Sequence, residues 1–189
     1  TAAALHPALL ESEVIRNYIP NIDANGVIHI ASLNNWVFFS AYVNGGKTTA
    51  VGKLEADIEG VTEDMVIKDF RGTLDGDYHT MTLNINHPAE RAGLIETLGG
   101  TIKNLYLQGT VTTEGKYAGG VAGAGGNSGV NIQNVVCKVD IVSGVDGDGT
   151  HGAMIGYSNV ALNITNSMFA GSISGEKTHS CGGFVGWLD

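Results

Sequence analysis

The segment TIKNLYLQGTV (residues 101–111) has two counterparts later in the chain, NIQNVVCKVDI (131–141) and NITNSMFAGSI (163–173). They align on the pattern Ile-x-Asn, with Ile102, Ile132 and Ile164 separated by steps of 30 and 32 residues. Glycine-bracketed pieces follow with a similar period: AGGVAG (118–123), HGAMIG (151–156) and CGGFVG (181–186), after a degenerate first member, AGLIE (92–96). Self-similarity at such a period predicts a solenoid, in which each unit buries its apolar face against its neighbours.

The alternation of side chains changes phase at Asn104, Asn134 and Asn166. A strand cannot change faces without a corner, so we place these asparagines at a bend, where their backbone angles are tolerated. There each amide can bond the copy in the next coil, about 4.8 Å away. The glycine-bracketed strands then form the third side of a roughly triangular coil. The positions expected to face inward after the bend are Leu105, Leu107, Gly109 and Val111, then Val135, Cys137, Val139 and Ile141, then Ser167, Phe169, Gly171 and Ile173.

The predicted fold is therefore an all-β parallel β-helix with an N-terminal helical cap. Residues 1–50 would form the cap and a lead-in strand, and residues 51–189 the coils. Two helices are expected, one in HPALLESEVIRNYIP (6–20), bounded by Pro7 and Pro20, and one in SLNNWVFFSAYVNGG (32–46), with Ser32 as N-cap. The second helix would cover the bare edge of the first coil. Because no capping element follows the last strand, we expect a piece of a longer repeat protein, the alternative being a partner that covers the final coil.

Composition and charge narrow the classes of function. The net charge of −9 argues against a nucleic-acid partner, which requires a clustered basic face. No apolar run is long enough to span a bilayer, so membrane insertion is not expected. The chain begins at Thr1 and not at Met, which is compatible with a removed signal peptide.

Several motifs together resemble a known family. LEADIEG (54–60), FRGTLDGDYHTM (70–81), IKNLYLQGTV (102–111) and the G-G-x-x-G pieces are similar to the GLUG-motif β-solenoids of bacterial secreted and cell-surface proteins, including non-catalytic N-terminal regions of some IgA1-type metallopeptidases. The resemblance covers most of the chain from about Val27 to Gly186. It implies a right-handed parallel β-helix, an extracellular location, and a role in adhesion, recognition or domain spacing. The metallopeptidase pattern His-Glu-x-x-His is absent from the sequence.

Candidate chemistry is confined to a few places. Asp57, Glu59, Asp75 and Asp77 could meet on one face and act as acids and bases, or Asp75 and Gly76 could simply form a turn with His79 at a corner. Asp146 and Asp148, with His151 nearby, could bind calcium or belong to a solvated turn, which we favour. The histidines show no zinc spacing, so we expect neither a metal nor a cofactor. Cys137 and Cys181 are interpreted as buried thiols and not as a disulfide.

An apolar stripe is predicted on the outside of the solenoid. By the same alternation Tyr106, Val136 and Met168 point outward in one column, with Lys138 in an adjacent column. The column is either a docking face or a set of tolerated surface residues.

Our leading interpretation is a non-enzymatic extracellular module that presents the sides and loops of the solenoid to a protein or glycan of a host or neighbouring cell, or that spaces neighbouring domains of its own chain. The alternative is a carbohydrate-active β-helix enzyme, a polysaccharide lyase or hydrolase that uses the acidic residues of the first coils. Such enzymes usually have more coils and a cleft with several basic residues, whereas this chain has 10 Lys and Arg in total.

Overall fold

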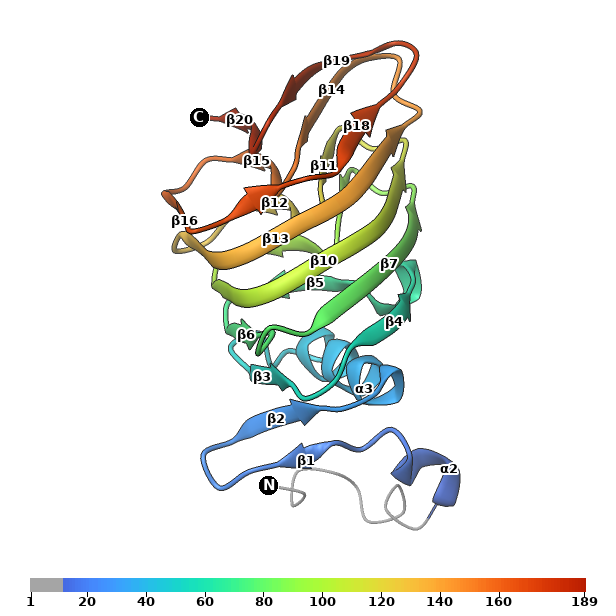
Figure 1. Cartoon of the computed structure of the whole chain (residues 1–189), viewed down its shortest axis with the longest axis vertical. Helices are drawn as coiled ribbons and strands as arrows, with labels where there is room; N and C mark the ends of the chain where they lie inside the picture. Colours follow the sequence, from blue (N-terminus) through green and yellow to red (C-terminus); the bar gives the residue numbers. More distant parts are fainter. Residues whose placement is uncertain (1–11) are drawn as a thin grey trace.

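The chain folds into a β-solenoid of about four turns, and the computed structural model describes residues 12–189 (Figure 1). The coils stack along one axis, with the N-terminal end at the bottom of Figure 1 and the C-terminal end at the top. Strands at the same position in successive coils pair in parallel and build three sheets. The chain rises from left to right across the front of Figure 1, so the coil is right-handed. The predicted fold class is confirmed.

The first sheet forms the front of Figure 1. Its strands are β1 (Asn21–Ile22), β2 (Val27–Ile30), β3 (Val51–Leu54), β4 (Ile58–Val61), β6 (Thr73–Asp75), β7 (Thr80–His87), β10 (Thr101–Thr113), β13 (Val130–Ser143), β16 (Leu162–Thr165), β17 (Met168–Phe169) and β18 (Ser172–Ser174). β1 and β2 pair antiparallel, and the other pairs of this sheet are parallel.

Two further sheets complete the coil. One contains β8 (Arg91–Ala92), β11 (Tyr117–Gly119), β14 (Gly147–Gly152) and β19 (Thr178–Gly182). The other contains β5 (Ile67–Phe70), β9 (Ile95–Leu98), β12 (Ala122–Gly125), β15 (Ile155–Ser158) and β20 (Val185–Leu188). A 3-10 helix, η2 (Glu63–Met65), lies between β4 and β5. Each repeating coil thus runs from a long strand of the first sheet through one short strand of each of the other two.

The register of the strands is the one that the Ile-x-Asn alignment predicts. Ile102 pairs with Ile132 and Ile132 with Ile164. The three asparagines have positive φ angles of 52°, 55° and 48° at positions 104, 134 and 166, as expected for a corner. The Asn134 amide Nδ2 donates to Asn104 Oδ1 at 3.0 Å, and Asn104 Nδ2 donates to Asp75 Oδ1 at 3.0 Å. The predicted amide bond is therefore present between Asn134 and Asn104, an aspartate stands in the preceding coil, and no side-chain hydrogen bond joins Asn166 to Asn134.

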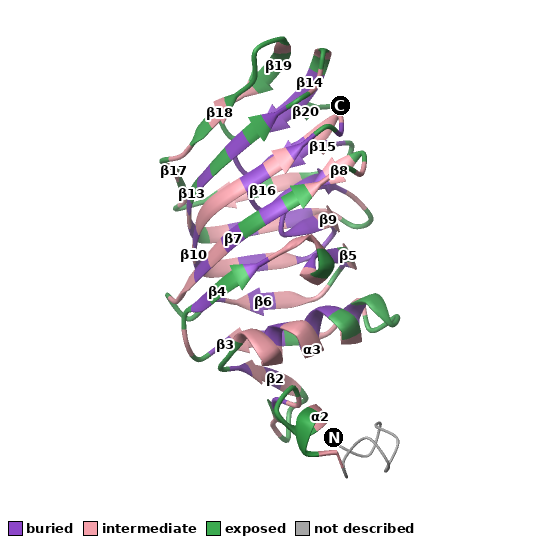
Figure 2. Ribbon diagram, turned by 90° about the vertical axis from the view of Figure 1, so that its right-hand side faces the viewer, coloured by how far each residue is buried: buried purple, intermediate pink, exposed green. Residues whose placement is uncertain are grey.

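The interior is filled by the predicted columns in the middle of the stack. Leu107 and Cys137 are both fully buried and adjacent in the β10–β13 ladder. Phe169 continues this column beside Cys137 but is only partly buried, because the last coil has no further coil above it among the described residues. Figure 2 shows the same change from buried strands in the middle to exposed β18 and β19 at the C-terminal end. We therefore expect Phe169→Ala to cost less than the ~3–5 kcal/mol of an enclosed phenylalanine.

The glycine brackets mark positions where the backbones of two sheets come too close for a side chain. A Cβ on Gly119, Gly152 or Gly182 would contact the carbonyl oxygen three residues later, and one on Gly156 would lie 2.7 Å from Ala118 N. The middle position varies between the brackets: a Cβ on Gly120 would clash with Cys137 Sγ and lie 2.9 Å from Ala153 O, but the other two brackets leave room for one. Ala153 already has a Cβ there, and Gly183 has nothing within 4 Å of a Cβ. The outer glycines are thus required by close packing at the corner.

Helix α3 (Leu33–Asn44) closes the N-terminal end of the tube, as predicted. The Ser32 side chain accepts a hydrogen bond from Asn35 N at 3.2 Å, which confirms it as the N-cap. Trp36 and Phe39 are fully buried, and the Phe39 ring meets Phe70 of β5 edge to face at 5.9 Å. Of the first expected helix the structure describes α2 (Glu13–Arg16), which ends before Pro20, and Pro7 with the start of the predicted helix lies outside the described residues.

Candidate functional site

The residues of the predicted outer stripe, Tyr106, Val136 and Met168, are neighbours on the first sheet and are called the apolar strip. Tyr106 pairs with Val136 in the β10–β13 ladder, and Val136 pairs with Met168 of β17. Met168 is 53% exposed, whereas Tyr106 and Val136 are partly buried. Lys138 is exposed in the adjacent column, beside Gln108. The geometry matches the prediction, and the column is a continuous apolar strip along the stacking axis.

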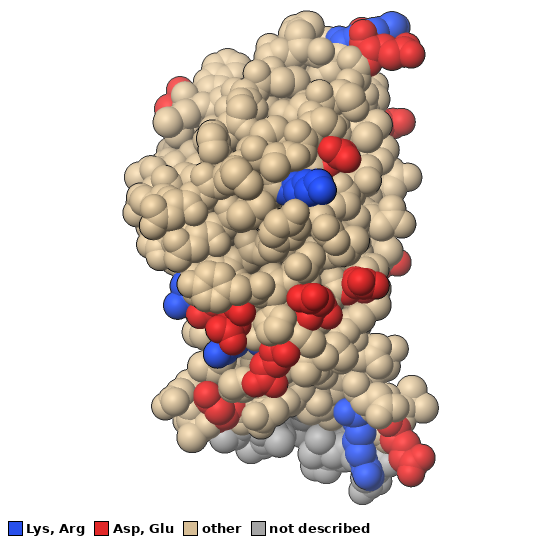
Figure 3. All heavy atoms as spheres, in the orientation of Figure 1, with Lys and Arg blue, Asp and Glu red and all other residues tan. Residues whose placement is uncertain are grey.

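Charges are unevenly distributed on the face that carries this strip. Figure 3 shows acidic side chains gathered over the lower, N-terminal coils of the face and few charged atoms over the upper coils. The acidic residues predicted as candidates for catalysis, Asp57, Asp75 and Asp77, belong to these lower coils. The face is thus divided into an acidic N-terminal part and a part with few charges around the strip, where Lys138 lies in the adjacent column.

The acidic residues do not share one site. Asp57 Oδ1 lies 3.3 Å from His79 Nδ1, Asp75 pairs with Lys103 at 3.2 Å, and Asp77 pairs with Lys53 at 3.1 Å. Glu59 is exposed on β4. Each of the three aspartates therefore has its own lysine or histidine partner, which is the arrangement of surface ion pairs and not of one shared site.

The hydrogen bonds to Asp57 and Asp75 favour their ionised forms. The backbone N–H of Thr80 lowers the pKa of Asp57, with a smaller contribution from His79. For Asp75, burial acts to raise the pKa, but hydrogen bonds from Asn104 and from the Asp77 backbone, together with Lys103, outweigh it and lower the pKa. Both groups are therefore carboxylates at neutral pH, whereas a general acid must be protonated there.

Acid is expected to weaken these N-terminal coils. A lowered pKa in the folded state means that the stabilisation from Asp75 is complete above the ordinary value of 3.8 and is lost as the pH falls through the folded-state pKa. The melting temperature measured at pH 7, 5 and 3 should fall below pH 4. In Asp75→Asn this fall in melting temperature should be smaller. The matched control is Asp64→Asn, which removes an exposed carboxylate of the preceding coil. If the two substitutions changed the pH dependence of the melting temperature equally, Asp75 would not be the carboxylate that stabilises these coils.

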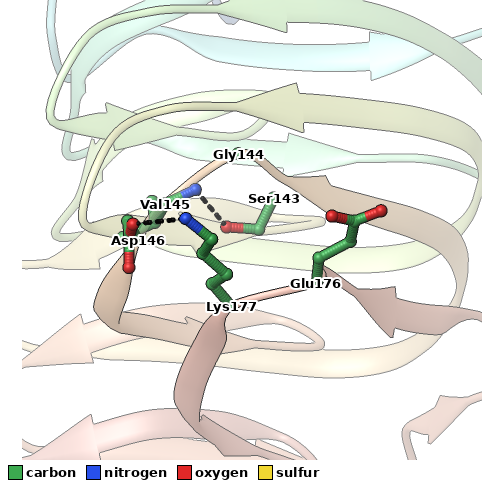
Figure 4. A pocket seen from close by; sticks show the side chains of 6 residues that line it. All are labelled: Ser143, Gly144, Val145, Asp146, Glu176 and Lys177. Carbon is green, nitrogen blue, oxygen red and sulfur yellow. Dashed lines mark hydrogen bonds and ion pairs between the residues drawn. The ribbon is translucent and has the colours of Figure 1, made fainter.

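The loop with Asp146 and Asp148 is held by ion pairs. Lys177 Nζ donates to Asp146 at 2.9 Å, and Lys116 lies 3.2 Å from Asp148. Lys177 and Asp146 line a pocket of about 370 Å³. Figure 4 shows Lys177, from the loop between β18 and β19, reaching Asp146, while the Glu176 side chain points away from this pair. The Ser143 hydroxyl accepts a hydrogen bond from Val145 N. His151 points inward, is fully buried and contacts Ser143 Oγ at 2.7 Å, and burial lowers its pKa. Within residues 12–189 no group of three His, Cys, Asp or Glu is arranged around a metal position.

The two cysteines are unpaired, as predicted, but only Cys137 is buried. Cys181 is exposed because β19 has no neighbouring strand on its outer edge in the described part of the chain, so the prediction of two buried thiols was wrong for this residue. Burial raises the pKa of the Cys137 thiol to about 11.

The two thiols should therefore react very differently. With an aromatic disulfide reagent at pH 8, the native protein is expected to release one equivalent quickly, and two after unfolding in guanidinium. Cys181→Ser should abolish the fast phase. Rapid reaction of both thiols in the native protein would show that the coil around Cys137 opens readily.

The structure reveals a pocket that sequence reasoning missed, at the corner between the two smaller sheets. Its volume is about 330 Å³. Tyr117 and Tyr157 pack with ring centroids 5.1 Å apart, and Tyr157 pairs with Trp187 on the next strand. The lining residues are Glu90, Arg91, Lys116, Tyr117, Tyr157, Trp187 and Asp189. We call this site the aromatic pocket.

Charged groups surround the rings of the aromatic pocket. Arg91 is next to Tyr117 in the ladder, and its Nη1 donates to Thr97 Oγ1 at 2.7 Å. Lys116 Nζ lies 5.6 Å from the Tyr117 ring centroid while it pairs with Asp148. The Trp187 side chain is left 51% exposed at the edge. A concave surface with aromatic faces and a few fixed polar groups is typical of a small-ligand site.

A partial signal for this pocket was present in the repeats. The alignment of the glycine-bracketed pieces places Tyr157 and Trp187 in one column. Because they follow the inward residues Ile155 and Val185 by two positions, alternation predicts that this column faces inward, so its exposure could not be foreseen. Tyr117, however, belongs to a different sheet. No alignment of repeats could place it against Tyr157, because this contact depends on how sharply the corner turns.

Comparison with models of protein families, with curated proteins and with solved structures found no match to the chain. Among the described residues, no helix has both the length and the apolar character needed to cross a bilayer.

Proposed function

We propose that the chain is a non-enzymatic binding module that acts outside the cell, as the resemblance to GLUG-motif proteins implies. The observation that carries the proposal is the aromatic pocket, where Tyr117, Tyr157 and Trp187 converge on the outer surface. Trp187 lies on β20, whose outer edge has no neighbour among the described residues, and it is 51% exposed beside the two tyrosines. A ligand that covers these rings would gain their apolar contact area.

The scaffold supports this use. Tyr117 lies on β11 and Tyr157 on β15, and each of these strands pairs in parallel with a strand on both sides, so the two tyrosines are held in place before any ligand arrives. Trp187 lies on β20, which pairs on one side only among the described residues. Preorganisation reduces the entropy that binding would otherwise cost. The apolar strip of Tyr106, Val136 and Met168 on the first sheet is a second surface for contact with a protein or a neighbouring domain.

Retention of the labelled protein on bacterial and epithelial cell surfaces and on mucin-coated plates tests the proposal. We expect saturable binding that unlabelled protein displaces. The same samples should be incubated with soluble polysaccharides and assayed for new reducing ends and for absorbance of unsaturated products. Polysaccharide cleavage that is lost in Asp57→Asn would favour the alternative enzyme, and the absence of saturable binding to every surface would refute the binding module.

A further inference from the structure

We infer that the aromatic pocket binds an uncharged oligosaccharide through Tyr117, Tyr157 and Trp187, an assignment that rests on the proposed binding function. The ligand class follows from the combination of aromatic faces, hydrogen-bonding groups and charge balance at this corner of the solenoid.

The aromatic faces match the apolar faces of sugar rings. Tyr157 and Trp187 occupy paired positions on adjacent strands, which lie about 4.8 Å apart, and both side chains line the pocket. The Tyr117 ring adds to this aromatic surface across the corner, tilted by 32° against Tyr157. The faces of aromatic rings carry partial negative charge, and the axial C–H groups of a pyranose carry partial positive charge. A sugar is therefore expected to lie flat on this surface.

The polar groups at the rim match sugar hydroxyls. A hydroxyl both donates and accepts a hydrogen bond, so it is best served by a site with both kinds of partner. The carboxylates of Glu90 and Asp189 are acceptors and form no ion pair among the described residues, whereas the Arg91 guanidinium supplies donors. Hydrogen bonds to ionised groups are stronger than those between neutral groups. An extended peptide offers its backbone groups but no comparable set of hydroxyls.

The charge of the site favours a neutral ligand. Glu90 and Asp189 balance Arg91 and Lys116, so the formal charges that line the pocket sum to zero. The whole chain has a net charge of −9, which repels sulfated or uronate-rich polymers at long range. The pocket volume of about 330 Å³ is near the lower end of the ~300–1,000 Å³ of small-ligand sites, which suits one or two sugar rings of a longer chain.

The test is an array of immobilised neutral and anionic glycans, followed by calorimetric titration of the best neutral ligand. Binding of at least one neutral glycan is expected, with affinity about tenfold or more weaker in Trp187→Ala and in Tyr157→Ala, because each removes a stacking face. Tyr78→Ala is the matched control, since Tyr78 is an exposed aromatic residue (77%) on the turn between β6 and β7 that belongs neither to the pocket nor to the apolar strip. Because Trp187 is exposed, its variant should melt at an unchanged temperature.

Tryptophan fluorescence gives a second reading in the wild-type protein. Trp36 is fully buried and Trp187 is half exposed, so quenching by acrylamide reports mainly on Trp187. A bound glycan should protect this residue, and Trp187→Phe should remove the quenchable emission.

The inference is overturned if no neutral glycan binds, if only anionic glycans bind, or if binding is equal in Trp187→Ala and Tyr78→Ala. These outcomes are separable from failure of the binding module itself. Saturable retention on cell surfaces that survives removal of glycans and is lost after protease treatment would keep the module and replace the glycan by a protein ligand. Loss of retention after glycan removal, with dependence on Trp187, supports both proposals.

Discussion

Phe39→Ala is expected to lower the free energy of unfolding by about 3–5 kcal/mol, the cost of truncating an enclosed phenylalanine. Phe39 is fully buried between the helical cap and the first coil, with its ring centroid 5.7 Å from Trp36 and 5.9 Å from Phe70. The cavity would lie where α3 joins the tube, and the backbone of the stacked strands can close it only in part. Chemical denaturation followed by circular dichroism measures the effect.

The neighbouring residue provides the matched control. Phe38 lies one position earlier on the same helix but is only partly buried, and it stacks on Tyr42 at 5.9 Å on the outer side. Phe38→Ala is expected to cost about 1 kcal/mol, as a partly exposed aromatic pair does. If the two substitutions cost the same, α3 does not act as the cap of the solenoid core.

Gly156→Ala is expected to destabilise the protein by about 3 kcal/mol or more, the upper range for an overpacked interior. A Cβ at this position would lie 2.6 Å from Gly123 O and 2.7 Å from Ala118 N, both of them backbone atoms. Backbone atoms that belong to paired strands cannot move aside as a flexible side chain can. Relief would require β15 to separate from β12, so the loss should appear as a lower melting temperature and a reduced yield of soluble protein.

Gly183→Ala is the control for this substitution. It lies in another copy of the same bracketed motif, but nothing is within 4 Å of its added Cβ, and the equivalent residue of the preceding coil is already Ala153. We expect a change within about 0.5 kcal/mol. A large loss at Gly183, or none at Gly156, would show that the glycines do not mark the close approach of the sheets.

The sequence predicts the repeating part of this fold in detail because stacked coils repeat the same local environment. Ile102, Ile132 and Ile164 align in sequence and also pair in space, since each coil contributes one residue to each column. The asparagines are recognisable for the same reason, because a corner with a positive φ angle recurs once per coil. The outer column of Tyr106, Val136 and Met168 follows from this register alone.

The ends of the stack are less predictable. Phe169 and Cys181 follow the inward pattern, yet Phe169 is only half buried and Cys181 is exposed. Periodicity indicates the direction of a side chain but not whether another coil covers it. For the same reason the charged residues of the first coils could be placed on a surface, but their pairing, such as Lys53 with Asp77, could not be foreseen.

By itself, the sequence of this protein determined the coil period, the residues of each inward column and the position of the helical cap, because each depends on a pattern that neighbouring coils share. Only the tertiary structure decided where the outward side chains of different sheets meet. Tyr117 reaches Tyr157 and the aromatic pocket because the chain turns sharply between β11 and β12. The angle of this turn is set by close packing between the backbones of two sheets at the glycines. Such a contact joins different strands, so the pattern of residues along one strand does not predict it.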